Sequence, residues 1–306
     1  MTTLNLNYET GFRHTLLGKL PYIPLLLAAV VMILPYYWMV IGAFKSFPEL
    51  QAAPPTFIVQ NPTFDNFFNP EWSRDEAKTQ ELQGLFQNWP QTVGGFLRFY
   101  ANSLFVSTVN TIFGLIVASI AAYVLAKHHF PGRNAIFVLI LASMMVPWQV
   151  TLIPGFMIVR DLGWIDSYLA LIIPAIPKAF TLFFLRQYML SIPDDLIDAA
   201  RVDGAGEFRI WWQVMLPLVV PAMIAMGLFM FLGEWNNLIW PLVVVHSQDM
   251  RTLPVIMSTM VSAYSTPTQL GLVMAASLLV SLPTLILFLV FQKQFVRGIA
   301  LTGIKG

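Results

Sequence analysis

The sequence predicts an all-α membrane protein that crosses the bilayer with six helices, and three observations support this fold class. Of the 306 residues, 57% are hydrophobic and only 11% are charged, whereas soluble proteins contain about 25% charged residues. Mean hydropathy is +0.68. Six apolar runs each provide the roughly 20 residues that a bilayer-spanning helix requires. This composition excludes an ordinary soluble enzyme, a nucleic-acid binder and a disordered chain.

The predicted spans follow a polar N-terminal segment, 1–20. The apolar run after this segment is too long for the core of a signal peptide, so it is interpreted as the first span. None of the six runs alternates like a strand, and backbone groups in lipid need partners within their own segment, so every run is predicted to be helical. The predicted spans are 21–44, 100–126, 134–159, 167–185, 218–240 and 270–292.

The segments between the spans differ in length and charge. Two long loops, 45–99 and 241–269, are predicted on the same side of the membrane, and the first carries six acidic residues. The polar segment 187–217 and the tail 293–306 are predicted on the opposite side.

Lys and Arg near the span ends orient the chain, because cytoplasmic loops carry an excess of basic residues. Four such residues lie on the side of the two long loops: Lys45, Arg98, Arg160 and Arg251. Ten lie on the other side: Arg13, Lys19, Lys127, Arg133, Arg186, Arg201, Arg209, Lys293, Arg297 and Lys305. Both termini and the segment 187–217 are therefore predicted to be cytoplasmic.

The sequence contains few groups for catalysis or cofactor binding. It has no Cys, hence no disulfide, thiolate metal site or Cys nucleophile. It also lacks the G-x-x-x-x-G-K-[ST] loop that binds nucleotide phosphates. We therefore expect no catalytic residue, no metal and no cofactor bound by this chain.

The segment 187–217 carries the most informative local pattern. Ser191 and Asp194 have the spacing of a capping box, which predicts a helix starting near Ile192. Gly204 and Gly206 are predicted to end or bend this helix before a second short helix. The small and apolar residues of the first helix suit docking into a groove of a partner, with a helix lying on the membrane surface as the alternative. These residues are Leu196, Ile197, Ala199, Ala200 and Val202.

The same segment resembles the loop E-A-A-x3-G-x9-I-x-L-P of ABC-importer permeases. Its counterparts here are Asp198-Ala199-Ala200, Gly204, Val214 and Leu216-Pro217, with Asp in place of Glu and Val in place of Ile. The shorter Asp198 side chain puts its reach to a basic partner residue in question.

Other segments resemble the carbohydrate-uptake permeases of the maltose type, so that the resemblance covers nearly the whole chain. They are 61–67, 99–104, the segment Glu234-Trp235-Asn236-Asn237 that continues to Pro241, and the C-terminal residues 294–306. The chain is similar to the six-span subunit of such a permease pair, which implies the fold of a type I ABC importer permease.

The resemblance implies a transport function shared among several polypeptides. A second permease subunit, two copies of a separate ATPase that binds ATP and Mg, and an external solute-binding protein are the implied partners, besides membrane lipid. Two groups of residues are implied to contact the ATPase. The coupling group is Asp198, Ala199, Ala200, Asp203, Gly204, Leu216 and Pro217, and the tail group is Arg297, Gly303 and Lys305.

Two charges within the predicted spans, Lys178 and Glu234, are candidates for the transport pathway, because charge at membrane depth is costly and usually functional. Asn236 and Asn237, with Trp235 and Trp240, combine amides with aromatic rings, a chemistry that suits sugars, and an interfacial aromatic belt is the favoured alternative. A structural role for Lys178 has equal weight, and Glu234 could be interfacial; pairing between the two, or of Lys178 with a partner subunit, stays open.

Carbohydrate import is the function that these features favour. Import of glycerol phosphates or polyols by the same machinery is the first alternative. An ion-coupled secondary transporter would require internal repeats, and a membrane enzyme would require a cluster of reactive groups. Neither feature is visible in the sequence.

Overall fold

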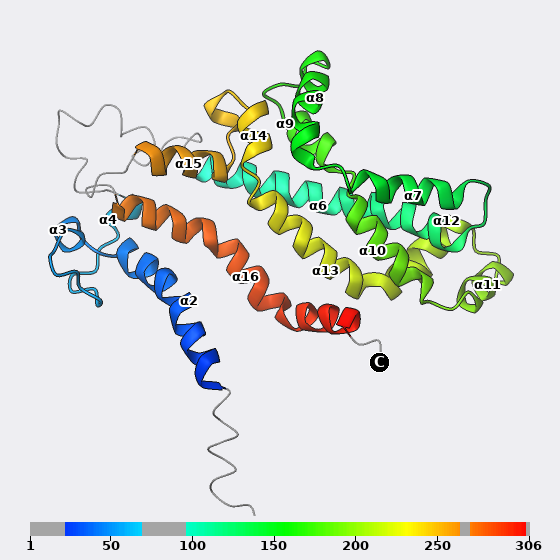
Figure 1. Ribbon diagram of the computed structural model, residues 1–306, viewed down its shortest axis with the longest axis horizontal. Helices are drawn as coiled ribbons and strands as arrows, with labels where there is room; N and C mark the ends of the chain where they lie inside the picture. The colour runs from blue at the N-terminus through cyan, green and yellow to red at the C-terminus, as the bar shows by residue number, and fades with distance from the viewer. Residues whose placement is uncertain (1–21, 69–95, 264–269, 304–306) are drawn as a thin grey trace, which may run out of the picture. The chain divides into compact units, whose positions relative to one another are not determined.

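The computed structural model describes residues 22–68, 96–263 and 270–303, and its side chains are described to residue 292 (Figure 1). In these residues the regular elements are helices, apart from one isolated β-bridge between Lys45 and Pro62. The chain divides into two compact units. Unit 1 comprises residues 1–72 and 265–278, and unit 2 comprises residues 73–264 and 279–306.

Unit 1 contains α2 (Tyr22–Ala43), the short helices α3 (Phe47–Leu50) and α4 (Asp65–Phe68), and the first residues of α16 (Leu270–Gly303). Gly42 of α2 lies against Met274 of α16, where a Cβ atom would collide with the Met274 side chain. The absence of a side chain at Gly42 therefore lets the two helices approach closely.

Unit 2 is built around the long helix α6 (Phe96–Lys127). The helices α10 (Ala179–Leu190) and α13 (Leu216–Trp235) pack along it (Figure 1). Small residues such as Ala118 and Ala122 of α6 are buried against apolar side chains of the other two helices. Because small side chains allow close helix packing in membranes, this three-helix core forms despite the apolar surroundings.

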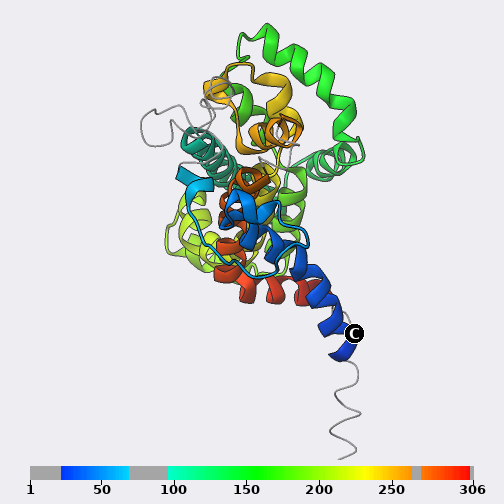
Figure 2. The ribbon, with the colours of Figure 1, turned by 90° about the vertical axis from the view of Figure 1, so that its left-hand side faces the viewer.

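Two of the predicted spans are interrupted in unit 2. The predicted span 134–159 is formed by α7 (Arg133–Ser143) and α8 (Trp148–Asp161), which bend by 99° at the break between them (Figures 1 and 2). Pro147 immediately precedes α8, and the ring of a proline disfavours helical backbone in the residue before it. The predicted span 167–185 is likewise divided into α9 (Tyr168–Ile172), the 3₁₀ turn η2 (Ile173–Ala175) and α10.

The remaining elements of unit 2 connect these helices. They are α11 (Asp195–Val202), α12 (Glu207–Ile210), the π-helical turn η3 (Trp211–Met215), α14 (Ile239–Val244), the 3₁₀ turn η4 (Gln248–Met250) and α15 (Leu253–Ala263).

Five helices are long and apolar enough to cross a membrane, and the bent pair α7–α8 raises the number to six if it counts as one span. The predicted fold class, an all-α membrane protein with several spanning helices, is confirmed for the residues that the structure describes. Most of the second half of the predicted loop 45–99 and the end of the loop 241–269 lie outside the described residues.

Candidate functional site

The helices α11 and α12 form a helical hairpin, residues 195–210, beyond the ends of α6 and α10. Acidic residues occupy the first turn of α11 and Arg201 occupies its last turn, which suits the helix dipole. Ile197 is buried in the core of unit 2, whereas Val202 is 87% exposed and Phe208 is 73% exposed. The hairpin is thus anchored by one face and leaves apolar side chains uncovered on the other.

The predicted capping box at the start of α11 is wrong. The Ser191 hydroxyl donates to the Tyr188 carbonyl of the preceding helix, at 2.7 Å. The Asp194 carboxylate accepts from Lys127 Nζ, at 2.6 Å, and α11 begins only at Asp195. The Asp194 carboxylate, which the local pattern assigned to the start of α11, is therefore paired with Lys127, a residue far away in the sequence.

Gly204 ends α11 as predicted. Its backbone has φ +79°, its N–H donates to the Arg201 carbonyl at 3.0 Å, and the next N–H, of Ala205, donates to the Ala200 carbonyl at 2.9 Å. These two bonds form the Schellman motif, which favours Gly at the left-handed position. Gly163 ends α8 with the same pair of bonds and φ +70°.

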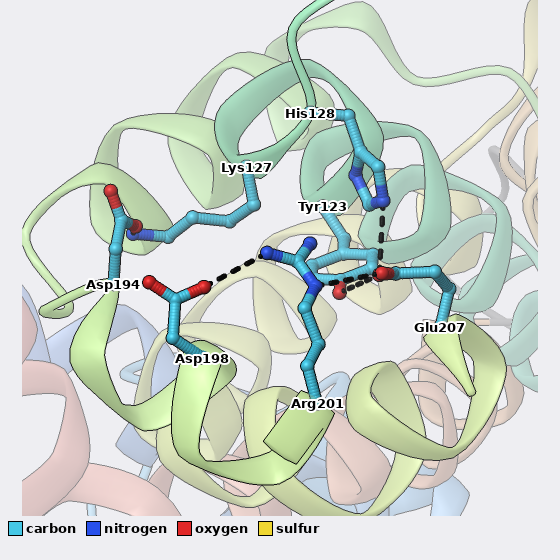
Figure 3. A network of polar contacts seen from close by, with 7 residues as sticks. All are labelled: Tyr123, Lys127, His128, Asp194, Asp198, Arg201 and Glu207. Atoms are coloured by element: carbon cyan, nitrogen blue, oxygen red, sulfur yellow. Dashed lines mark hydrogen bonds and ion pairs between the residues drawn. The ribbon is translucent and has the colours of Figure 1, made fainter. Parts of the chain in front are cut away.

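A network of polar side chains fixes the hairpin to the end of α6 (Figure 3). Its centre is the Glu207 carboxylate, which accepts from Tyr123 Oη at 2.7 Å and from Arg201 Nε at 2.9 Å. His128 Nε2 lies 3.0 Å from the same carboxylate. Arg201 Nη1 also donates to Asp198, at 3.0 Å. The two helices of the hairpin are therefore joined to each other and to α6 through one acidic residue.

The charges of this network shift the pKa values of its members. The hydrogen bond and charge of Lys127 lower the pKa of Asp194. The hydrogen bond from Arg201 to Glu207, with the charge of Glu207, raises the pKa of Arg201. These ion pairs thus favour the charged states of Asp194 and Arg201.

The predicted coupling residues do not all face the same way. Asp198, Ala199, Asp203 and Gly204 are exposed on the hairpin, whereas Ala200 is half-buried and packs against the core of unit 2. In the first turn of α13, Leu216 is half-buried and Pro217 is exposed. Of the tail group, the backbones of Arg297 and Gly303 are helical in α16, and their side chains and Lys305 lie outside the described residues.

Lys178 and Glu234 form an ion pair within this chain. Lys178 occupies the break before α10, and its Nζ lies 2.6 Å from Glu234 Oε1 near the end of α13. The side chain of Glu234 is only 7% exposed. Its second oxygen accepts from the amides of Asn110 and Asn237, both at 3.4 Å. A charged pair in such a setting needs these extra donors to offset the loss of hydration.

A cavity of about 500 Å³ opens beside this pair. It lies where the breaks before α10 and after α13 meet the start of α8. Its lining includes Trp148 and Thr151 of α8, the pair Lys178 and Glu234, Asn237, and Trp240 of α14. The structure thereby brings three of the four predicted pathway residues together at one cavity.

Asn236 is the exception among the predicted pathway residues. Its side-chain amide donates to the Leu232 carbonyl at 2.8 Å, and it is not part of the cavity lining. The amide thus completes the end of α13, and Asn236 lies outside this cavity.

Comparison with known proteins identifies the family. The sequence pattern of the family described as "Binding-protein-dependent transport system inner membrane component" matches residues 111–301. The chain belongs to this family. Membership places it in the inner membrane as a transport component, which confirms the predicted resemblance to ABC permeases.

Three curated members of this permease family are similar over most of the chain. The arabinooligosaccharides transport system permease protein AraQ of Halalkalibacterium halodurans is 34% identical and covers 91% of this chain and 93% of its own. The lactose transport system permease protein LacG of Rhizobium radiobacter is 32% identical, covering 94% and 97%. The sn-glycerol-3-phosphate transport system permease protein UgpE of Yersinia enterocolitica is 33% identical, covering 71% and 79%.

A solved structure shares the fold. It is a chain of a bacterial ABC transporter involved in the import of the acidic polysaccharide alginate, with a TM-score of 0.76 and 22% identity. The alignment covers 93% of this permease and 98% of that chain. The type I ABC importer permease fold that the sequence suggested is therefore shown for this chain.

Sequence reasoning missed several residues of the permease that the structure brings together. Glu207, Tyr123 and Lys127 hold the hairpin, and Trp148 lines the cavity. The partners Tyr123 and Glu207 are 84 residues apart, so no local spacing relates them. An acidic residue directly after Gly206, opening a new helix, was the one local signal for Glu207.

Proposed function

We propose that this chain is one of two permease subunits of an ATP-driven importer that moves a carbohydrate across the cytoplasmic membrane. A second permease subunit completes the pathway, an external solute-binding protein delivers the sugar, and two ATPase subunits bind ATP and Mg and supply the energy. This chain contributes transport and no catalytic residue.

The hairpin 195–210 is the observation that carries the coupling role. Its outer face exposes Val202 and Phe208 beside Ala199 and Gly204. Exposed apolar side chains next to small residues are typical of a surface covered by a partner. The hairpin lies in the segment that resembles the coupling motif of ABC-importer permeases, so we propose that this partner is the ATPase.

The connection of the hairpin to α6 supports a mechanical role. When ATP closes the ATPase dimer, a docked hairpin moves with it, and the Glu207 network transfers this motion to α6 and the helices packed on α6. Rigid-body rotation of the spans then closes the pathway on one side of the membrane and opens it on the other.

The proposed orientation follows from the same arrangement. An ATPase uses cytoplasmic ATP, so the hairpin and both termini lie in the cytoplasm. The basic residues Lys127, Arg201 and Arg209 near the hairpin agree with the excess of positive charge on that side. The tail with Arg297, Gly303 and Lys305 is proposed to reach the ATPase interface from the same side.

Carbohydrate is the proposed substrate class because two relatives aligned over more than nine-tenths of this chain bear the names of arabinooligosaccharide and lactose transport. Glycerol phosphate remains the second candidate because UgpE is equally similar over a shorter alignment.

Reconstitution with the partner subunits in proteoliposomes tests the function. ATP-dependent uptake of neutral oligosaccharide, without uptake of sn-glycerol-3-phosphate, is the expected result. Uptake of the phosphate ester alone supports the second candidate, and absence of ATP-dependent uptake of any of these compounds overturns the proposal.

Gly204→Leu tests the coupling role, and Gly163→Leu is its matched control. Both glycines end helices by the same motif, and a side chain at either meets no atom within 4 Å in this chain, so both variants carry similar backbone strain. We expect Gly204→Leu to lose ATP-dependent uptake and Gly163→Leu to retain it. Equal losses of uptake in both variants would show that backbone strain, and not impaired docking, causes the effect.

A further inference from the structure

The cavity beside Lys178 and Glu234 has the features of a ligand site. At membrane depth, irregular backbone is tolerated where it is buried in protein or lines a water-accessible space. The breaks before α10 and after α13 meet the start of α8 at this cavity. The cavity measures about 500 Å³, a size common for small-molecule sites, and both polar and apolar groups line it.

The charge of the lining restricts the ligand. Lys178 and Glu234 are the charged residues of this lining in the described part of the chain, and they neutralise each other at 2.6 Å. An anionic ligand such as a phosphate ester would need a cation that is free to bind it, and Lys178 is already engaged. The cavity therefore favours a ligand without net charge.

The remaining chemistry of the lining suits hydroxyl groups. A Lys ammonium has three N–H donors, and within the described residues one of them is directed to Glu234. The side chain of Lys178 is 30% exposed, so the other donors can reach a ligand hydroxyl. The amide of Asn237 contacts Glu234 at 3.4 Å, and its carbonyl oxygen adds an acceptor.

Two indole rings contribute flat apolar surfaces to the lining. Trp148 is 49% exposed at the start of α8. The Trp240 ring is fixed by its Nε1, which donates to the Ala170 carbonyl at 2.8 Å. Flat aromatic rings beside hydrogen-bonding groups match a pyranose or furanose, which has apolar C–H faces and a rim of hydroxyls.

We propose that this cavity is a binding subsite for one neutral sugar unit, contributed to the transport pathway by this subunit itself. Trp148 and Trp240 contact the faces of the ring, Lys178 and Asn237 bind its hydroxyls, and Glu234 holds these two side chains in place. The inference rests on the proposed carbohydrate function and adds to it the charge class of the substrate and the residues that contact it.

The lack of native Cys permits a direct test in the assembled transporter, because an introduced Cys is the only thiol of this chain. Thr151→Cys places a thiol in the cavity, and Ser143→Cys places one outside it on α7. The two positions match, since both are exposed and both hydroxyls bond to the carbonyl three residues earlier. The measurement is the rate of labelling by a hydrophilic thiol reagent.

Neutral di- and trisaccharides are expected to slow the labelling of Thr151→Cys severalfold and to leave Ser143→Cys unchanged. A uronic acid disaccharide and sn-glycerol-3-phosphate are expected to protect neither. Adding Trp148→Ala should raise the saccharide concentration required for protection about tenfold, as for the loss of one aromatic contact. Phe180→Ala, an exposed aromatic residue of α10 outside the lining, should not change it.

The outcomes separate this inference from the proposed function. If the transporter takes up neutral sugar but no sugar slows labelling of Thr151→Cys, the subsite is overturned and the function stands. Protection by the anionic compounds alone overturns the neutral subsite. If no neutral sugar is taken up and none protects, both proposals fail.

Discussion

Lys178 and Glu234 are 56 residues apart in the sequence, and their charged atoms Nζ and Oε1 lie 2.6 Å apart. Lys178 directly precedes α10, and Glu234 lies in the last turn of α13. The Glu234 carboxylate is nearly enclosed. The pair therefore links the break before α10 to the end of α13, and it brings charge to the wall of a cavity without giving that wall net charge.

Removing one partner of this pair should destabilise the protein more than removing both. Lys178→Met leaves the Glu234 carboxylate without its cation, at an expected cost of about 3 kcal/mol, the lower end for a broken buried pair because Lys178 is partly exposed. The double variant Lys178→Met with Glu234→Gln should recover most of this loss. The midpoint of thermal unfolding in detergent measures the order, and an additive double variant would contradict the coupling.

Glu207 should be required for transferring motion from the hairpin to α6. Glu207→Gln removes the charge and one of two equivalent acceptor oxygens, so that Tyr123, His128 and Arg201 can no longer all be satisfied. We expect less uptake per ATP hydrolysed while the protein remains inserted and assembled.

The control for this variant is Arg209→Gln on the same short helix. Its guanidinium contacts only Gln213 among the hydrogen bonds of the described side chains. We expect an unchanged ratio of uptake to ATP hydrolysis for Arg209→Gln. A similar fall in both variants would show that α12 is merely sensitive to substitution.

Asp166 should stabilise the contact between the connection after α8 and the connection after α14. Its Oδ1 accepts from the N–H groups of His246 and Ser247 and from the Ser247 hydroxyl, at 2.9 to 3.1 Å. Asp166→Ala leaves these donors without their acceptor, at a cost of about 1–3 kcal/mol. Asp166→Asn keeps an oxygen in the same place and tolerates the positive φ of 60°, so thermal unfolding should change little.

The same residue predicts a dependence on pH. Burial raises the pKa of Asp166, but the hydrogen bonds from Ser247 and His246 outweigh burial and leave the pKa below its ordinary value. A lowered pKa in the folded state means that the stabilisation is complete above about pH 4, the ordinary pKa of Asp, and is lost as the pH falls below it. The protection of the 246–247 amides from hydrogen exchange, relative to their intrinsic rates at each pH, should fall below about pH 4 in the native chain and much less in Asp166→Asn.

Gly114 should be required for the close packing of α6 against the break before α10. A Cβ atom at this position would lie 3.2 Å from the Ile176 carbonyl and would collide with Met230. Gly114→Ala should therefore lower stability by about 1–3 kcal/mol. Gly233→Ala on α13 meets no atom within 4 Å and should be neutral or slightly stabilising in thermal unfolding; the reverse order would refute the packing argument.

Local sequence patterns were sufficient to predict the fold class, and they located the loop for which we propose a coupling role. Apolar length is a local property, because a span must satisfy its backbone internally, and a helix end such as Gly204 depends on one residue and its immediate neighbours. The candidate charges Lys178 and Glu234 were also visible, since charge is conspicuous within apolar runs.

Which of these groups meet depends on how the helices pack in three dimensions. In the folded chain Asp194 pairs with Lys127 instead of capping α11, and Glu207 lies at the centre of the polar network. Ala200 packs against the core, and the Asn236 amide bonds to the end of α13 instead of lining the cavity. The packing also brings two helix breaks and the start of α8 together at one cavity, which Trp148 lines. These contacts connect residues tens of positions apart, so they depend on helix packing, which no local pattern of the sequence encodes.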